Sequence, residues 1–149
     1  MIHIEESILI NRPIAEVFAF MSETRNLHLW QTDVLEARQT PEGPVQVGTQ
    51  LTLVRAMMGR KIEGTADIVA YEPPTRYAYK TTSGPAVTGL NTCEATAEGT
   101  RVTTMFDMQT GGLFSLADPL VARTIKRSVE SGLANLKDLL EIQTAGVSS

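Results

Sequence analysis

The chain of 149 residues has 42% hydrophobic residues, 20% charged residues and a formal net charge of -4. This length fits a single domain, and the composition excludes a largely disordered chain or a fibrous repeat. The 13 basic residues form no long tract, which argues against nucleic-acid binding as the main function.

The N-terminal segment predicts one strand and two short helices. Isoleucines alternate with polar residues over Ile2–Ile10, which is the period of a strand with one buried face, and Glu6 interrupts the apolar side. Pro13 suits the first turn of a helix, and apolar residues recur at helical spacing after it. Residues 23–31 predict a second short helix that ends near Trp30.

Runs with strand character continue from Val34 to Met108 and are separated by short turn segments. Connections this short join antiparallel neighbours, so we expect a meander sheet that curls. In the run at 61–71 both faces look partly apolar, so its inward face stays undecided, and a bulge near Gly64 would reconcile the two patterns. The six predicted strands are 34–40, 50–58, 61–71, 76–82, 87–96 and 101–109.

A long C-terminal helix is predicted from about Pro119 to Ile142. Asp118 is a favourable N-cap residue, and proline suits the first helical position. At 1.5 Å per residue the helix would be roughly 36 Å long, enough to cross a sheet. We expect residues 1–143 to form one domain and 144–149 to be a flexible tail. One apolar stripe predicts the buried face of the helix: Val121, Ile125, Val129, Leu133, Leu136 and Leu140.

This order of elements indicates an α+β protein whose helices gather on one side of an antiparallel sheet. No repeat, low-complexity segment or interdomain linker interrupts it. Because the ends of a curved sheet turn away faster than a helix can follow, we expect a cavity between the sheet and the long helix.

Short motifs spread from Ile8 to Glu141 resemble those of a known group of proteins. They are Asn11-Arg12-Pro13, Trp30, Val47-Gly48-Thr49, the turn from Tyr71 to Tyr77, the segment from Gly99 to Thr103, and the last leucines with Glu141. In these motifs the chain resembles the START-like, or Bet v 1-like, superfamily (SRPBCC), and within it the polyketide cyclase/dehydrase and lipid-transport family. The resemblance implies a helix-grip fold: a seven-stranded antiparallel sheet curves around the long C-terminal helix, and two short helices follow the first strand. It also implies a pocket for a hydrophobic small molecule, but no single chemistry, because this scaffold serves carriers, receptors and enzymes alike.

The sequence contains none of the common signatures of metal or nucleophilic catalysis. His3 and His28 stand in no metal-ligand spacing, and the single cysteine, Cys93, cannot supply an iron–sulfur site. The sequence has no nucleophile elbow, P-loop or dinucleotide-binding glycine motif. We therefore expect no metal and no cofactor.

Polar residues among inward-facing strand positions are the candidates for ligand contacts. Arg55 could anchor an acidic or enolic oxygen, or pair with a carboxylate at the rim. Tyr79 could present its hydroxyl to a ligand or be a structural tyrosine. Cys93 could line the same space as Asn91 or be a small core residue. The predicted ligand-binding residues are Trp30, Leu53, Arg55, Met57, Tyr77, Tyr79, Asn91, Cys93, Phe106, Ile125 and Val129.

The leading hypothesis is a binding module that holds a small hydrophobic or amphipathic molecule in the cavity, with Arg55 and Tyr79 to orient it. The alternative is an enzyme of the polyketide cyclase/dehydratase kind. Its candidate catalytic residues are Glu6, His28 and Tyr79, provided that they lie within about 10 Å of one another. A third hypothesis, a regulator that docks on a larger protein, would need a large exposed apolar patch, and the sequence shows no obvious one.

The remaining expectations concern location and partners. The single cysteine and the lack of a secretory signal predict a cytoplasmic protein. No apolar run approaches the roughly 20 residues that cross a bilayer, so we expect no stable membrane insertion. A small hydrophobic molecule is the expected partner, nucleic acid is not, and a homodimer stays open.

Overall fold

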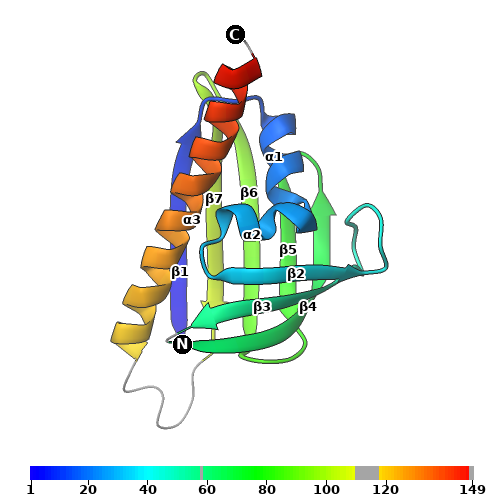
Figure 1. The fold of residues 1–149 in the computed structure, drawn as a ribbon, viewed down its shortest axis with the longest axis vertical. Helices are drawn as coiled ribbons and strands as arrows, with labels where there is room; N and C mark the ends of the chain where they lie inside the picture. The colour runs from blue at the N-terminus through cyan, green and yellow to red at the C-terminus, as the bar shows by residue number, and fades with distance from the viewer. Residues whose placement is uncertain (58, 110–117, 148–149) are drawn as a thin grey trace.

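A seven-stranded antiparallel sheet curves around one long helix in the computed structural model, which describes residues 1–57, 59–109 and 118–147 (Figure 1). This arrangement confirms the predicted α+β helix-grip fold. Short helices lie between the first two strands, as predicted. In chain order the elements are β1 (Ile2–Ile10), α1 (Ile14–Ser22), η1 (Thr24–Asn26), α2 (Leu27–Trp30), β2 (Val34–Thr40), β3 (Gln50–Met57), β4 (Arg60–Glu72), β5 (Arg76–Thr81), β6 (Val87–Thr96), β7 (Gly99–Met108) and α3 (Asp118–Val147).

The strand order in the sheet is β1-β7-β6-β5-β4-β3-β2. Strands β2 to β7 pair consecutively, as expected for a meander with short connections. Strand β1 pairs with β7 instead, in a register that places Ile2 opposite Met108 and Ile10 opposite Thr100. Strands β1 and β2 therefore lie at opposite edges of the sheet, and α1, η1 and α2 connect them across one end of its concave side (Figure 1).

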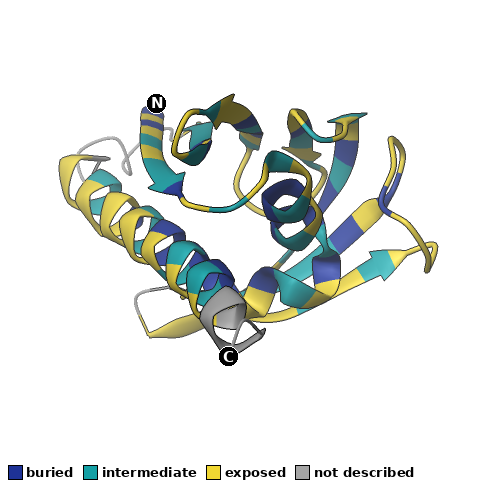
Figure 2. Cartoon of the chain, turned by 90° about the horizontal axis from the view of Figure 1, so that it is seen from above, coloured by how far each residue is buried: buried dark blue, intermediate teal, exposed yellow. Residues whose placement is uncertain are grey.

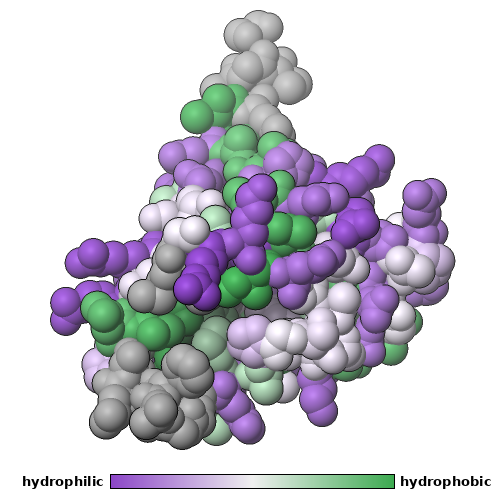
Figure 3. Space-filling view, turned by 60° about the horizontal axis from the view of Figure 1, so that its bottom comes forward, coloured by the Kyte–Doolittle hydropathy of each residue, from purple (hydrophilic) through white to green (hydrophobic). Residues whose placement is uncertain are grey.

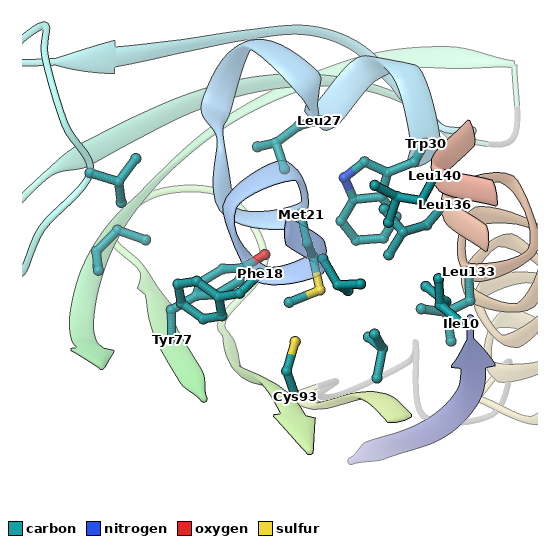
Figure 4. Packing of buried hydrophobic residues seen from close by; sticks show 14 of the residues in the cluster. Ile10, Phe18, Met21, Leu27, Trp30, Tyr77, Cys93, Leu133, Leu136 and Leu140 are labelled. Atoms are coloured by element: carbon teal, nitrogen blue, oxygen red, sulfur yellow. The ribbon is translucent and has the colours of Figure 1, made fainter. Parts of the chain in front are cut away.

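The periodicity of the N-terminal segment explains its burial. In β1 the isoleucines at 2, 4 and 10 are buried. Their neighbours Met1, His3 and Glu5 are exposed. In α1 the buried side chains Val17, Phe18 and Met21 recur at helical spacing and form one face. That face packs into the core cluster beside Tyr77 (Figure 4).

Strand β4 contains a bulge, but not at the position that the sequence suggested. Ala66 and Ile68 are buried, so the even-numbered residues point inward along this part of the strand. The pairing with β5 then shifts register between Ile68 and Ala70, which leaves Val69 exposed. Beyond the shift the parity reverses, and Tyr71 points inward, with its ring centroid 5.6 Å from that of Phe18. The bulge predicted near Gly64 thus lies at Val69, where it brings an aromatic ring into the core.

Helix α3 packs its predicted apolar stripe against the sheet. Leu133, Leu136 and Leu140 are almost completely buried, whereas the outer face of the helix is exposed (Figure 2). The helix begins at Asp118, as the N-cap and proline signals indicated, and it continues to Val147 rather than ending near Ile142. Helix ends are the least certain part of a sequence-based assignment. The flexible tail predicted for 144–149 stays a prediction.

Candidate functional site: a cavity between the sheet and the helices

A cavity of about 260 Å³ lies between the concave face of the sheet, η1, α2 and α3. Side chains from β3 to β7 form one wall, and α3 contributes the opposite wall through Ile125 and Val129. Leu27 and Trp30 of α2 cover the space between them, because their i, i+3 spacing turns both side chains inward. This pocket lies between the sheet and the long helix, where the order of elements led us to expect a hollow.

Exposed lining residues place the mouth of the cavity at one end of the sheet. Ser83 and Pro85 in the β5–β6 turn are exposed, and Thr124 near the start of α3 is exposed as well. Figure 3 shows this end of the molecule, where apolar residues gather near the centre and hydrophilic side chains surround them. The opposite end of the cavity lies beneath η1 and α2, where Thr24, Leu27 and Trp30 are buried.

Most of the predicted ligand-binding residues line this cavity. Cys93 does not: it is buried in the core cluster with Met21 and Tyr77, so the structure favours its interpretation as a small core residue (Figure 4). The side chain of Met57 lies outside the described residues. The predicted residues that do line the cavity are Trp30, Leu53, Arg55, Tyr77, Tyr79, Asn91, Phe106, Ile125 and Val129.

Two of the proposed catalytic residues lie away from the cavity. Glu6 leans from β1 toward α3, where its carboxylate Oε1 is 3.8 Å from Nζ of Lys126. His28 is exposed on the outer side of α2, since Leu27 and Trp30 take the inward positions. Neither residue lines the cavity, and Tyr79 does. The three candidates therefore do not converge on one substrate-sized space.

An ion pair neutralises the charge at the cavity wall. Arg55 donates from its Nη1 atom to Oδ2 of Asp33 over 2.9 Å and from its Nη2 atom to Oε1 of Gln31 over 3.2 Å. Register explains the contact: Val34 in β2 pairs with Arg55 in β3, so the residue before Val34 lies beside the guanidinium. Asp33 and Arg55 are the only charged residues among the described residues that line the cavity. The sequence left two roles open for Arg55, a ligand anchor or a partner of a carboxylate. The structure shows the pairing with a carboxylate.

Asp33 and Gln31 are site residues that the sequence analysis did not select. Both follow α2 in a loop of mixed composition, and nothing in that local pattern marks them as inward-facing. Their role depends on the pairing of β2 with β3, which brings together residues 22 and 24 positions apart. A correct prediction of how β2 pairs with β3 would have placed Gln31 and Asp33 beside Arg55.

Tyr79 lies flat against the sheet because its cross-strand partner is a glycine. Tyr79 pairs with Gly89 on β6, and a Cβ atom built on Gly89 would lie 2.2 Å from Cζ of the Tyr79 ring and 2.5 Å from its hydroxyl oxygen. The phenol therefore occupies the space that any other residue at position 89 would fill. Burial raises the pKa of the Tyr79 hydroxyl, with a smaller opposing effect of Arg55 and a raising effect of Asp33. The hydroxyl stays protonated at neutral pH and can donate a hydrogen bond, but it is a poor base.

The other polar lining groups are neutral. Tyr77 is buried, its ring centroid lies 5.9 Å from that of Phe18, and burial raises the pKa of its hydroxyl. Asn91 is also buried, and its Oδ1 atom accepts a hydrogen bond of 2.6 Å from the Thr104 hydroxyl. This bond leaves the Asn91 amide nitrogen as a donor on the cavity wall.

Two buried polar atoms of cavity-lining residues have no hydrogen-bond partner among the described residues: Nε1 of Trp30 and Oγ1 of Thr24. An unsatisfied buried donor costs roughly 1–3 kcal/mol, so native proteins contain few of them. The third atom of this kind, Oγ1 of Thr96, belongs to a residue that does not line the cavity.

Neither metal ligation nor membrane crossing is indicated by the part of the chain that the structure describes. Within it, no three histidine, cysteine, aspartate or glutamate side chains come close enough together to hold a metal ion. No helix in the described ranges combines the length and apolar character that a membrane span requires.

The chain belongs to the family described as polyketide cyclase / dehydrase and lipid transport, which it matches over residues 1–141. This match confirms the resemblance seen in the sequence motifs. Comparison with curated proteins finds no match.

Solved structures share the fold at low sequence identity. The protein TTHA0849 from Thermus thermophilus is 20% identical, with a TM-score of 0.79 over 91% of this chain and 94% of that chain. The di-domain ARO/CYC StfQ from the steffimycin biosynthetic pathway is 14% identical, with a TM-score of 0.81 over 97% of this chain and 52% of that chain. Ara h 8.0201 is 17% identical, with a TM-score of 0.69 over 92% of this chain and 95% of that chain. These likenesses show the Bet v 1-like fold, and this chain spans about half of the StfQ chain.

Proposed function

We propose that the protein binds an uncharged, largely apolar small molecule in the cavity between the sheet and α3. The observation that carries this proposal is a cavity of about 260 Å³ whose only charged lining residues, among those described, pair with each other. Apolar walls supply affinity, and a few fixed polar groups orient the molecule. The family name, which includes both lipid transport and cyclase chemistry, is consistent with such a ligand.

The charge pairing argues for a neutral ligand. The Arg55 guanidinium already has a carboxylate partner in Asp33, so it offers a ligand anion no uncompensated positive charge. A carboxylate taken from water into this cavity would lose its hydration without a matching cation. Tyr79 and Asn91 remain available at the wall, and both can donate a hydrogen bond to a neutral oxygen.

The acid–base alternative has weaker support. Of its three candidates only Tyr79 reaches the cavity wall, and burial keeps the hydroxyl of that residue protonated. Neither of the other two candidates lies beside Tyr79 to act as its base, and a proton donor alone can orient a ligand but cannot complete a proton shuttle. The geometry therefore favours binding over catalysis by this set of residues.

A cavity-filling variant tests the proposal. Ala66 is buried and lines the cavity from β4, so we expect Ala66→Phe to occupy ligand space and to weaken the binding of prodan, a neutral naphthalene dye, at least tenfold. The blue shift of prodan emission measures binding. Val69→Phe is the matched control, because Val69 lies on the same strand but is exposed and outside the cavity. Val129→Phe, which enters the cavity from α3, provides the same test if Ala66→Phe does not fold.

The expected result is prodan binding to the unmodified protein and to Val69→Phe, with loss in either cavity-filling variant. Absence of binding to the unmodified protein, or equal binding to all variants, would overturn the proposal.

A further inference from the structure

Trp30 and Thr24, in the short segment η1–α2 at the buried end of the cavity, each carry a buried polar atom without a hydrogen-bond partner among the described residues. Trp30 is 4% exposed and Thr24 is 3% exposed, so neither the indole N–H nor the hydroxyl reaches solvent. An indole nitrogen can only donate a hydrogen bond, whereas a threonine hydroxyl can donate or accept one. Both residues line the cavity.

The indole of Trp30 is packed in the apolar core cluster and its backbone contacts α3, so the ring cannot turn outward without breaking contacts. The Trp30 carbonyl oxygen accepts a hydrogen bond of 3.5 Å from Nδ2 of Asn135. Gly132 permits this approach, since a Cβ atom at that position would lie 3.2 Å from the same carbonyl oxygen. Figure 4 shows the indole nitrogen on the ring edge that faces away from α3 and toward Leu27. The donor is thus held inside the protein by its own helix and by the neighbouring one.

The surroundings of these atoms decide what kind of partner fits. Leu27, Met21 and Phe18 belong to the same apolar core cluster as Trp30. The indole N–H and the threonine hydroxyl are both uncharged, so they cannot compensate a buried carboxylate or phosphate, but they can satisfy a neutral oxygen.

We propose that Trp30 and Thr24 form a subsite for an uncharged oxygen acceptor of the ligand, such as a ketone or ether oxygen, with the Trp30 Nε1–H as the donor. This inference rests on the proposed function and deepens it, because it states which chemical group of the ligand enters the buried end of the cavity. A ligand with one acceptor oxygen on an apolar ring system satisfies an atom that has no partner in the described parts of the chain.

Fluorene and 9-fluorenone are suitable probes, because they share one ring system and differ in a single carbonyl oxygen. We expect the unmodified protein to bind fluorenone about threefold to tenfold more tightly than fluorene, which corresponds to one net hydrogen bond. Calorimetric titration measures both dissociation constants. Trp30→Phe should reduce this ratio to near one while it keeps an aromatic ring in place, and Thr24→Val should reduce the ratio in part.

Thr96→Val is the matched control. It removes the third buried polar atom that lacks a partner within the described ranges. Thr96 lies outside the cavity, so the fluorenone-to-fluorene ratio should stay unchanged.

A second measurement does not depend on variants. Trp30 is the only tryptophan, so the ¹⁵N-labelled protein gives one indole N–H resonance. Fluorenone should move its proton signal downfield, as a new hydrogen bond does, and fluorene should not.

The outcomes separate the two proposals. Equal affinity for both probes, an unchanged ratio in Trp30→Phe, or an indole signal that does not move downfield when fluorenone binds would overturn the acceptor subsite and leave the cavity-binding function standing. Failure of both probes and of prodan to bind would overturn both proposals.

Discussion

At the scale of single residues, the site depends on the lack of a side chain at Gly89 as much as on the side chains that line the cavity. Gly89 has no side chain, and the ring of Tyr79 fills the space above its Cα atom. Glycine weakens a strand interior, so its presence in β6 has a structural reason here. The glycine lets a large aromatic residue lie flat, which keeps the centre of the cavity open and holds the phenol near Arg55.

Gly89→Ala should displace the Tyr79 ring, because the new methyl group would overlap it. We expect the variant to lose about 1–3 kcal/mol of unfolding free energy, as overpacked sites do, and to bind prodan more weakly. Urea denaturation and dye titration measure the two effects. The control is Gly89→Ala in a Tyr79→Ala background, where the clash is absent and the same change should cost almost nothing. An equal loss in both backgrounds would contradict this account of Gly89.

Cys93 should behave as an inert core residue. Burial raises the pKa of its thiol to about 12 from an ordinary value of 9.0. Because the thiolate is the reactive form, thiol reagents should modify Cys93 only when the protein unfolds. The rate of reaction with an aromatic disulfide reagent, with and without urea, measures this protection. Rapid modification of the folded protein at neutral pH would show that the thiol is accessible.

The same pKa shift predicts how Cys93 contributes to stability at high pH. Above about pH 9 the unfolded chain releases the thiol proton and the folded protein retains it, so the contribution is present at lower pH. It is lost progressively as the pH rises from about 9 to about 12. Cys93→Ala removes this contribution, and the stability difference between the two proteins should therefore shrink over that range.

At the scale of secondary-structure elements, the end of α3 is joined to the end of β1. Nζ of Lys137 donates to the Leu9 carbonyl oxygen over 2.9 Å, and the Glu141 carboxylate accepts hydrogen bonds from Lys137 and from the backbone N–H of Asn11. The hydrogen bond from Lys137 is the main cause that holds the pKa of Glu141 below its ordinary value. These contacts fix the helix at the edge strand opposite β2, and thereby set how far α3 stands from the sheet.

Glu141→Gln should destabilise the protein at neutral pH by less than about 1 kcal/mol, because both side chains of the pair are partly exposed to solvent. A carboxylate with a lowered pKa contributes stability above its unfolded pKa and loses that contribution as the pH falls through its folded pKa. The difference between variant and unmodified protein should therefore be measurable at pH 7 and smaller near pH 3, below the ordinary value of 4.5. Urea denaturation at the two pH values provides the comparison.

Glu130→Gln is the matched control on the same helix. Glu130 also lies four residues from a lysine, but its closest approach to Lys126 is 4.0 Å and both side chains are more than half exposed. We expect no measurable change there. A loss equal to that of Glu141→Gln would show that the position near β1 adds nothing.

At the scale of the whole molecule, the elements could be predicted from the sequence because their signals are local. The alternation in β1, the helical spacing in α1 and the stripe on α3 each lie within one element, and burial follows the pattern. The bulge at Val69 could not be placed, because it is defined by pairing with another strand.

The candidate site was predictable only in part for the same reason. Inward-facing residues such as Leu53 and Phe106 follow from strand periodicity, and both line the cavity. The contact between Arg55 and Asp33 depends on strand register. The core position of Cys93 depends on the depth at which Met21 and Tyr77 pack. The Trp30 nitrogen, which has no partner among the described residues, depends on how α2 meets α3.

The placement of β1 and β2 at opposite edges of the sheet affects how the protein is made. During synthesis β1 leaves the ribosome before the other strands that the structure describes, yet the one strand it pairs with among them is β7, which is translated after the other six. Nascent chains that end before residue 99 thus carry an unpaired apolar strand, for which a chaperone or another chain is an available partner. The apolar side chains that line the cavity are enclosed between the sheet and α3 only after α3 has been translated.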